Sequence, residues 1–216
     1  MSFIIAIDGP ASSGKGTVAA QLAKILNFTY LESGAIYRGL ALHSKNKNIA
    51  VADEDSLIAS LTDFNLSFND GKTLLNGEDI TQEIRQEEIG NRASQISQHQ
   101  NLRKNLLEYQ RNFAQNNLVT DGRDMGSTVF PQANLKVFLT ASVETRATRR
   151  YKQLLNNSIC ATIEPILQDI KKRDYDDSNR KVAPLCFDDS YKYLDNSELS
   201  IEETLKQILQ WYNELH

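Results

Sequence analysis

The sequence predicts an α/β fold with a central parallel sheet, and three observations lead to this fold class. An apolar run, residues 3–7, is followed at once by a glycine-rich turn and then by a segment with helical spacing. Further short apolar runs alternate with helical segments, which is typical of a parallel sheet with helices on both faces. Residues 64–80 instead alternate apolar and polar side chains around turns, which predicts a small inserted antiparallel sheet.

Length and composition fit one such domain. The chain has 216 residues, of which 40% are hydrophobic and 24% are charged, as in ordinary globular proteins. The net charge of −4 and the pI near 5.5 argue against a nucleic-acid partner, which favours basic proteins. They do not exclude nucleotide binding, because a local arginine cluster can lie on an acidic protein.

The cysteines and the apolar runs bear on location. Cys160 and Cys186 form no metal or CxxC pattern, which is typical of free thiols in a reducing cytosol. The first apolar run is too short for a signal peptide, and no run approaches membrane-spanning length. We therefore expect a cytoplasmic protein without membrane association.

The glycine-rich turn has the context of a phosphate-binding loop, because it lies between a strand and a helix. Its glycines let successive backbone N–H groups point into one concavity, and the following helix adds its positive dipole end. Lys15 supplies a mobile charge for the outer phosphates. The residues expected to bind ATP here are Gly9, Pro10, Ala11, Ser12, Ser13, Gly14, Lys15, Gly16 and Thr17. In the helix, Val18, Leu22, Ile25 and Leu26 share one face.

The end of this loop departs from the plain pattern. Gly16 stands where Ser or Thr usually follows the lysine, and Thr17 comes next. A Gly-Lys-Gly-Thr ending resembles the nucleoside monophosphate kinases among P-loop proteins. The hydroxyl of Thr17 is expected to ligate Mg²⁺.

Elements on either side of the inserted sheet follow from periodicity. Before it, we expect a strand over 29–31, a helix that buries Ile36, Leu40 and Leu42, and a helix over 53–61 capped by Asp53. After it, helical patterns cover 82–98 and 102–113, with Leu102, Leu106 and Phe113 along one side.

The C-terminal half continues the alternation. Strands are expected at 118–120, closed by Asp121, at 135–139 and at 191–194. Between them lie a basic helix, a helix over about 163–175 and a charged loop that Arg180 closes. A capping box of Ser200 and Glu203 begins a terminal helix that buries Ile201, Leu205, Ile208 and Leu209.

Polar residues follow several of these strands. Because ligands bind at the carboxyl ends of strands in such sheets, we expect Asp8, Ser33, Asp121 and Arg123 to act together.

A second phosphate-binding system is indicated by arginines. They are Arg38, Arg103, Arg123, Arg146, Arg149, Arg150, Arg173 and Arg180. A hydrolysing switch needs about one such group, so this number indicates a second anionic substrate, a phosphate acceptor rather than water. Arg146, Arg149 and Arg150 can also be read as a solvated helix face. Arg85, Arg92 and Arg111 lack such context and are expected at the surface.

Two aspartates have sharper expected roles. Asp121 occupies the Walker B position and would hold Mg²⁺ directly or through water, while Asp8 is either a further metal candidate or a residue that orders the loop. Asp124 can accept from the exocyclic amine of cytosine, with Arg103 or Ser94 at the rest of that edge, or it can form an ion pair with a neighbouring arginine.

Catalysis is expected to be positioning and electrostatic, because the attacking phosphate is already anionic. The catalytic residues predicted are Lys15, Asp121, Arg123 and Arg180, with Mg²⁺ sharing the developing charge. Residues around 154–161 are expected to form the lid that excludes water.

The chain resembles the bacterial-type cytidylate kinases, a P-loop nucleoside monophosphate kinase family. The stretches that carry the resemblance span nearly the whole chain: Ile7-Asp8-Gly9-Pro10, Ser13-Gly14-Lys15-Gly16-Thr17, Ser33-Gly34-Ala35-Ile36-Tyr37-Arg38, Asn76-Gly77-Glu78-Asp79-Ile80, Ala93-Ser94-Gln95, Asp121-Gly122-Arg123-Asp124-Met125-Gly126, Val129-Phe130-Pro131, and Asn179-Arg180 with Val182-Ala183-Pro184-Leu185. The resemblance implies ATP-dependent phosphorylation of CMP and dCMP to CDP and dCDP by a monomer. It implies a P-loop three-layer sandwich with a core (about 1–32, 117–150 and 180–216), a monophosphate-binding lobe (about 33–116) and a short lid (about 151–179).

The same resemblance implies roles for individual residues. The monophosphate is met by Ser33, Tyr37, Arg38, Ser94, Arg103, Arg123, Asp124, Arg173, Asp177 and Arg180. Within this set, cytosine is met by Ser94, Arg103 and Asp124, the sugar by Arg173, Asp177 and Tyr37, and the phosphate by Arg38, Arg123 and Arg180. Arg149 is assigned to ATP. Glu32 stands where aspartate is expected.

Three other readings compete. A P-loop kinase with another acceptor, such as UMP or a coenzyme precursor, would keep the same chemistry. A GTPase-type switch would need an Asn-Lys-x-Asp motif, and Asn46-Lys47 is not followed by that aspartate. A nucleotide-binding adaptor without turnover would not need so many arginines.

Overall fold

The computed structural model describes residues 2–69, 71–156 and 160–215. The chain divides into two compact units. The core unit comprises residues 1–31 and 113–216, and the inserted unit comprises residues 32–112.

The core unit is built on a five-stranded sheet in the order β2-β6-β1-β7-β8. Its strands are β1 (Ile4–Asp8), β2 (Thr29–Glu32), β6 (Leu118–Gly122), β7 (Leu135–Thr140) and β8 (Tyr191–Asp195). β1 pairs in parallel with β6 and β7, and β7 pairs in parallel with β8. Every residue of β1 is buried, as expected for a central parallel strand. The predicted parallel sheet is confirmed.

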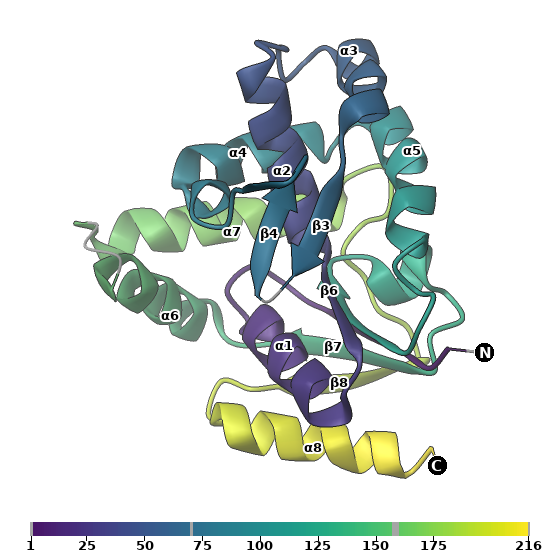
Figure 1. Ribbon diagram of the computed structural model, residues 1–216. Coiled ribbons are helices and arrows are strands. Elements are labelled where there is room, and N and C mark those ends of the chain that lie inside the picture. The colour runs from purple at the N-terminus through teal and green to yellow at the C-terminus, as the bar shows by residue number, and fades with distance from the viewer. Residues whose placement is uncertain (1, 70, 157–159, 216) are drawn as a thin grey trace. The chain divides into compact units, whose positions relative to one another are not determined.

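One face of this sheet is covered by α1 (Lys15–Leu26) and α8 (Ile201–Asn213), which lie side by side in Figure 1. Their apolar stripes pack on the inward side chains of the central strands. The buried cluster comprises Ile5, Ile7, Val18, Ala19, Leu22, Ala23, Val119, Leu135, Val137, Leu139, Leu205 and Ile208. The capping box of Ser200 and Glu203 begins α8 as predicted.

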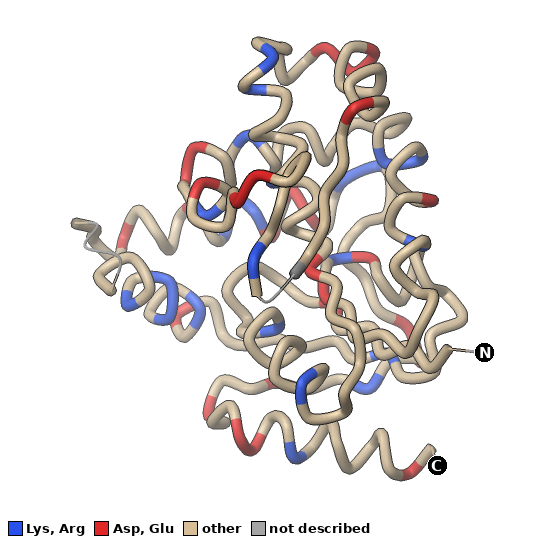
Figure 2. Tube along the Cα trace, in the orientation of Figure 1, with Lys and Arg blue, Asp and Glu red and all other residues tan. Residues whose placement is uncertain are grey.

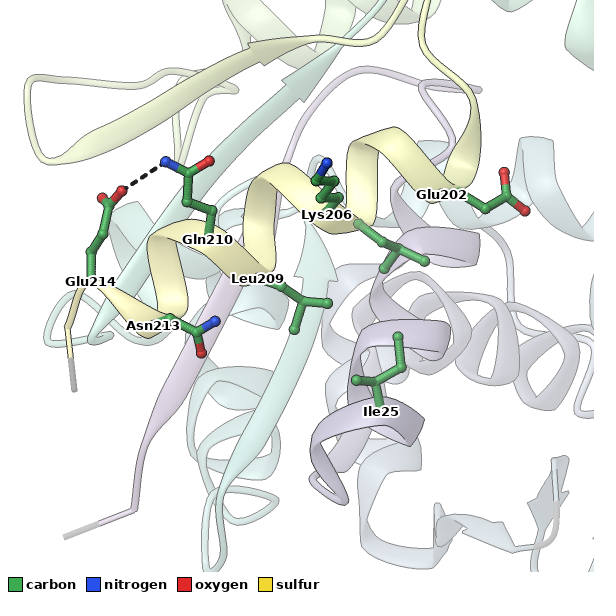
Figure 3. A pocket seen from close by; sticks show the side chains of 8 residues that line it. Ile25, Glu202, Lys206, Leu209, Gln210, Asn213 and Glu214 are labelled. Atoms are coloured by element: carbon green, nitrogen blue, oxygen red, sulfur yellow. Dashed lines mark hydrogen bonds between the residues drawn. The ribbon is translucent and has the colours of Figure 1, made fainter.

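One predicted core position, Ile201, is wrong, and Ile25, which was placed on the apolar face of the first helix, is also exposed. Ile25 is 55% exposed and Ile201 is 41% exposed, because each lies at the margin of its helix stripe. Ile25 lines a groove of about 700 Å³ between α1 and α8. Figure 3 shows Ile25 facing Leu209 across this groove. The groove contains none of the residues assigned above to a nucleotide.

Two further helices follow the sheet strands. They are α6 (Val143–Asn156) and α7 (Ile163–Asn179), and they pack against each other. The predicted charged loop before Arg180 is wrong, because the helix continues to Asn179 and makes this segment its last turns. The predicted lid, around 154–161, falls in part on residues 157–159, which lie outside the described residues. Within the described ranges, no helix is both long and apolar enough to cross a membrane.

The inserted unit holds the small sheet that the alternating pattern predicts. Its antiparallel strands are β3 (Leu66–Asn69), β4 (Lys72–Leu75) and β5 (Glu78–Asp79). Its helices are α2 (Ser33–Asn46), α3 (Glu54–Ala59), η1 (Ser60–Asp63), η2 (Glu83–Arg85), α4 (Glu87–Ile96) and α5 (Gln100–Arg111). Ile36, Leu40 and Leu42 of α2 are buried as expected. Asp53 caps α3 by accepting from the backbone N–H of Ser56.

Local periodicity misjudged three features of this unit. The predicted helix over 82–98 is broken at Gln86, whose extended backbone separates η2 from α4. Phe113 lies beyond the end of α5. Arg92 is not a surface residue, because its guanidinium donates to the carbonyl oxygens of Ala41 and Ile49. It ties α4 to α2, a contact between distant segments that no local pattern reveals.

Candidate active site

The glycine-rich loop has the backbone shape of an anion cradle. It joins β1 to α1, and Ser12 and Gly14 have left-handed backbone angles, with φ of 60° and 90°. Such turns direct successive N–H groups into one concavity. At Gly9, an added Cβ would lie 2.0 Å from the carbonyl oxygen of Leu139, so the loop passes too close to β7 for any side chain.

Lys15 lies folded back over this loop. Its side chain is buried, and Nζ donates to the carbonyl oxygen of Pro10 over 3.1 Å. The pKa of Lys15 is lowered to about 7, chiefly because burial penalises the ammonium and next because Arg123 lies nearby. A bound polyphosphate would offset both effects.

The loop also holds a buried hydroxyl without a hydrogen-bond partner among the described residues, that of Ser13. A buried polar group left in this way costs about 1–3 kcal/mol. A phosphate oxygen could accept a hydrogen bond from this hydroxyl, so binding an anion would remove that cost.

Asp121 lies where a metal would meet the loop. It is buried in β6, and its Oδ1 accepts from the hydroxyl of Tyr30 over 2.7 Å. Its Oδ2 lies 3.8 Å from where a Cβ on Gly16 would be, which places the carboxylate beside the first turn of α1. Thr17 follows in that turn and is exposed. A carboxylate and a hydroxyl are hard oxygen donors, and they fit Mg²⁺ with phosphate and water as further ligands. No group of three or more potential metal-ligating side chains occurs among the described residues.

Asp8 has a different environment from Asp121. Its carboxylate is fully buried and accepts from the backbone N–H groups of Met125 and Gly126 and from the hydroxyl of Tyr191, each over 2.8 Å. Burial raises the pKa of Asp8 to about 6 despite these hydrogen bonds. These hydrogen bonds order the backbone of residues 125–126, and none of them is to the glycine-rich loop that Asp8 was expected to order.

Four of the expected acceptor residues form one network at the carboxyl end of β6. Arg123 Nε donates to Asp177 Oδ2 over 2.6 Å. Arg180 lies 3.4 Å from Asp124 and 3.9 Å from Asp177. Asp124 therefore forms the ion pair that was the alternative to base recognition. Because each arginine already contacts a carboxylate, each is held where a phosphate could replace that partner.

Arg173 pairs with a carboxylate of its own helix. Its Nε pairs with Asp169, four residues earlier in α7, over 2.9 Å. Such a pair contributes little to stability when partly exposed.

Basic residues gather along α6, as Figure 2 shows. Arg146 is buried, forms a bidentate pair with Asp174 of α7 and donates to the carbonyl oxygen of Ala11 over 3.2 Å. It is therefore not on a solvated helix face. Arg150 donates to Gln153 within α6.

Arg149 of α6 contacts the glycine-rich loop directly and also through Asn196, a residue that the sequence did not single out. It donates to the carbonyl oxygen of Ser13 over 3.1 Å and to both side chain and backbone of Asn196. The amide of Asn196 also donates to Ser13 over 3.0 Å. Asn196 directly follows β8, so the rule that strand ends carry ligand-site residues could have found it. Tyr30 and Asp174, by contrast, carry no such signal.

The inserted unit positions the remaining expected residues separately. The guanidinium of Arg38 donates to the carbonyl oxygen of Ile84 over 2.7 Å. A Cβ on Gly90 would lie 3.0 Å from that guanidinium, so the glycine leaves room for it. Arg103 lies over the ring of Tyr37, 5.4 Å from its centre.

The two expected serines of this unit differ in setting. The Ser33 hydroxyl is buried and accepts from Gln110 over 2.9 Å. Ser94 is half-buried, and its carbonyl oxygen accepts from the hydroxyl of Ser97 over 2.9 Å. Arg103 donates to the carbonyl oxygen of Ser97 over 3.2 Å. The structure thus connects Arg103 with the 94–97 segment.

A phosphate cradle between a parallel strand and a helix, with a buried lysine and paired arginines beyond it, defines a P-loop phosphotransferase. Comparison with known proteins narrows this class. The cytidylate kinase family model matches residues 5–214. The chain is 49% identical to the cytidylate kinase of Burkholderia cenocepacia over 98% of this chain and 93% of that one. It is also 49% identical to that of Chromobacterium violaceum over 98% and 96%.

The chain belongs to the cytidylate kinase family. A solved structure of an uncharacterised protein from Eubacterium ventriosum shares its fold, with a TM-score of 0.55 at 14% identity over 98% of this chain and 99% of that one.

Proposed function

We propose that this chain transfers the γ-phosphoryl group of ATP to the phosphate of CMP or dCMP, producing ADP and CDP or dCDP. The observation that carries the proposal is the arginine–carboxylate network beside Lys15. Arg123 and Asp177 lie near enough to Lys15 to shift its pKa, so this arginine–carboxylate pair adjoins the phosphate loop. A nucleotide-hydrolysing switch needs only about one such arginine.

The chemistry requires little from the protein beyond position and charge. An acceptor phosphate oxygen is already anionic, so in-line attack on the γ-phosphorus needs no general base. Lys15 and the arginines stabilise charge that spreads over the transferred oxygens. Buried groups do this best, because charges interact more strongly away from water.

We assign ATP to the glycine-rich loop and Arg149. The backbone N–H groups, the Ser13 hydroxyl and Lys15 would hold its phosphates. The two hydrogen bonds from Arg149 to Asn196 and the one to Ser13 fix its guanidinium beside the loop. Mg²⁺, held by Thr17 and Asp121 directly or through water, would supply charge neutralisation between the phosphates.

We assign the acceptor phosphate to Arg123 and Arg180 of the core unit and to Arg38 of the inserted unit. Arginine grips phosphate with two parallel hydrogen bonds, and a phosphate dianion competes well with a carboxylate for it. Asp177 would then be released from Arg123 and become free to accept from a sugar hydroxyl. Tyr37 and Arg173 complete the proposed sugar set, with Ser33 also assigned to the monophosphate.

Cytosine is assigned to Asp124, Arg103 and Ser94. A carboxylate attracts the exocyclic amine of cytosine and repels the carbonyl that uracil carries in its place. In this structure Asp124 is buried and paired with Arg180. That pairing holds the carboxylate in place at the carboxyl end of β6.

We also propose that the chain acts as a monomer in the cytoplasm. Both cysteines are free and exposed, in keeping with a reducing compartment. Residues 151–179 remain our proposed lid. Asp174 of α7 pairs with Arg146, and Arg146 in turn donates to the carbonyl oxygen of Ala11, so α7 is connected with the glycine-rich loop.

The experiment is ADP formation from ATP and Mg²⁺ with CMP, dCMP, UMP or AMP offered separately. Turnover with CMP and dCMP, and little with the others, is the expected result. Turnover with UMP alone would keep the kinase and remove the base assignment. ADP formation that is independent of any acceptor would overturn the proposal. Lys15→Met serves as the inactive control for contaminating kinases.

A further inference from the structure

We infer that Asp8 is a positioning residue for the acceptor nucleotide, acting through the turn that follows Asp124. This inference rests on the proposed function. Asp8 ends β1, directly before the phosphate loop, yet its carboxylate forms its hydrogen bonds with residues outside that loop. All three of its hydrogen bonds go to Met125, Gly126 and Tyr191.

The turn that Asp8 holds is a single π-helical turn, η3 (Met125–Val129). The first N–H groups of a helical turn have no partner within it, and a negative charge there is favourable. Asp8 supplies one carboxylate oxygen to Met125 N–H and the other to Gly126 N–H. It is thus an N-terminal cap provided by a strand 117 positions away.

This turn is directly attached to the residues proposed to hold the acceptor. The carbonyl oxygen of Asp124 accepts from the N–H groups of Thr128 and Val129, over 2.9 and 3.0 Å. Shifting the turn therefore shifts Asp124, and Arg123 one residue before it. The Arg123–Asp177 and Arg180–Asp124 pairs depend on those positions.

Tyr191 and Gly126 pack closely around the carboxylate of Asp8. Tyr191 of β8 donates its hydroxyl to the same Asp8 oxygen as Gly126 does. A Cβ on Gly126 would lie 2.6 Å from that hydroxyl, so turn, tyrosine and carboxylate are closely packed. Asp8 is fully buried, which means that water cannot replace a lost oxygen.

Asp8→Asn is the informative change. It preserves the side-chain volume but replaces one carboxylate oxygen with an NH₂ group. This NH₂ group cannot accept a hydrogen bond, so one of the two backbone N–H groups loses its acceptor. We expect the KM for CMP to rise about tenfold, the effect of one unpaired buried donor. The KM for ATP should change less than about twofold, since no loop group loses a partner.

Two further variants separate this role from a general loss of stability. Tyr191→Phe removes one hydrogen bond to Asp8 but leaves both backbone N–H groups paired, so its KM for CMP should rise less than about threefold. Gly126→Ala leaves Asp8 unchanged but places a methyl group against the Tyr191 hydroxyl, which displaces the turn and should reproduce the acceptor-specific rise. It also decides the question by itself if Asp8→Asn does not fold.

Each result has a defined reading. An unchanged KM for CMP in Asp8→Asn and Gly126→Ala, or an equal rise for both substrates, overturns the inference. Calorimetric titration with CMP in the absence of ATP gives the same comparison for binding alone. If the wild-type chain does not use CMP, the proposed function fails first. The variants are then compared with whichever acceptor the wild-type chain phosphorylates.

Discussion

Arg123 and Asp177 form a 2.6 Å hydrogen bond that joins the end of β6 to the last turns of α7. Burial by itself would raise the pKa of Asp177, but Arg123 and Arg180 lower it below its usual value. The carboxylate is thus ionised and occupies an arginine that the proposed function gives to a phosphate. This pair connects the acceptor site with the helix proposed to move over it.

Replacing Asp177 with asparagine tests that connection. The variant loses both the ionic partner of Arg123 and the proposed sugar acceptor, so the KM for CMP should rise about tenfold, as when one charged hydrogen bond is removed. The KM for ATP should stay within about twofold. Asp176→Asn, one residue earlier in α7, is the matched control, and steady-state kinetics with both substrates is the measurement. Equal effects at 176 and 177 would contradict the assignment.

Asp124 decides acceptor selectivity in the proposed function. Asp124→Ala removes the carboxylate that attracts the cytosine amine and repels the uracil carbonyl. The ratio of kcat/KM for CMP over UMP should fall at least about tenfold, which corresponds to about 1.4 kcal/mol of discrimination. Competition between the two acceptors in one reaction measures this ratio. A ratio that is unchanged while both activities fall equally would reduce Asp124 to a partner of Arg180.

Lys15 should reduce the stability of the free chain while serving catalysis. Its pKa is about 7 in the folded chain, against 10.5 for the unperturbed side chain. Between those values the unfolded chain binds more protons, so the free energy of unfolding should increase as pH rises from 7 towards 10. Lys15→Met should lack this increase and unfold at a higher temperature near pH 7.

The same variant should lose at least about a hundredfold in kcat, because one preorganised charge is removed.

Thermal unfolding of the wild-type chain and of Lys15→Met from pH 6 to 9 tests the predicted difference in stability. A Lys15→Met protein that is less stable across this range would show that the buried ammonium is well compensated in the free chain.

Asn196 is expected to affect ATP and not the acceptor. Asn196→Ala removes the side-chain bonds to Arg149 and to the Ser13 carbonyl oxygen, which leaves the guanidinium with fewer constraints. We expect the KM for ATP to rise about fivefold to tenfold, within the range for lost hydrogen bonds, with the KM for CMP unchanged. Asn213→Ala, an exposed position on α8, is the control. A selective rise in the KM for CMP would place Arg149 on the acceptor instead.

Removing Mg²⁺ tests the assignment of Asp121. A chelator should abolish turnover, and Asp121→Asn should raise the Mg²⁺ concentration needed for half-maximal rate about tenfold or more. Tyr30→Phe removes the hydrogen bonds from the tyrosine hydroxyl to Asp121 and to the carbonyl oxygen of Gly16 but leaves the carboxylate itself, so it should have a smaller effect. The Mg²⁺ dependence of rate at fixed ATP is the measurement. Identical Mg²⁺ curves for Asp121→Asn and the wild-type chain would exclude Asp121 as a ligand.

Local signals in the sequence were sufficient for much of this protein. The strand–turn–helix at the N-terminus, the turns around the small sheet, and the caps at Asp53 and Ser200 each depend on residues a few positions apart. Such features arise from backbone conformation and short-range hydrogen bonds. Because two of these stretches, the N-terminal turn and the turn at 76–80, also carry the family resemblance, the class of chemistry could be predicted as well.

The tertiary structure decided what depends on contacts between distant segments. Ile25 and Ile201 belong to apolar stripes but remain exposed, because the neighbouring helix does not cover them. Arg92 is fixed by the carbonyl oxygen of Ala41 in another helix and by that of Ile49 beyond it. Asp8 reaches a turn that lies more than a hundred positions away. Burial, ion pairing and pKa depend on which segments pack together, and a sequence pattern with a range of a few residues does not contain that information.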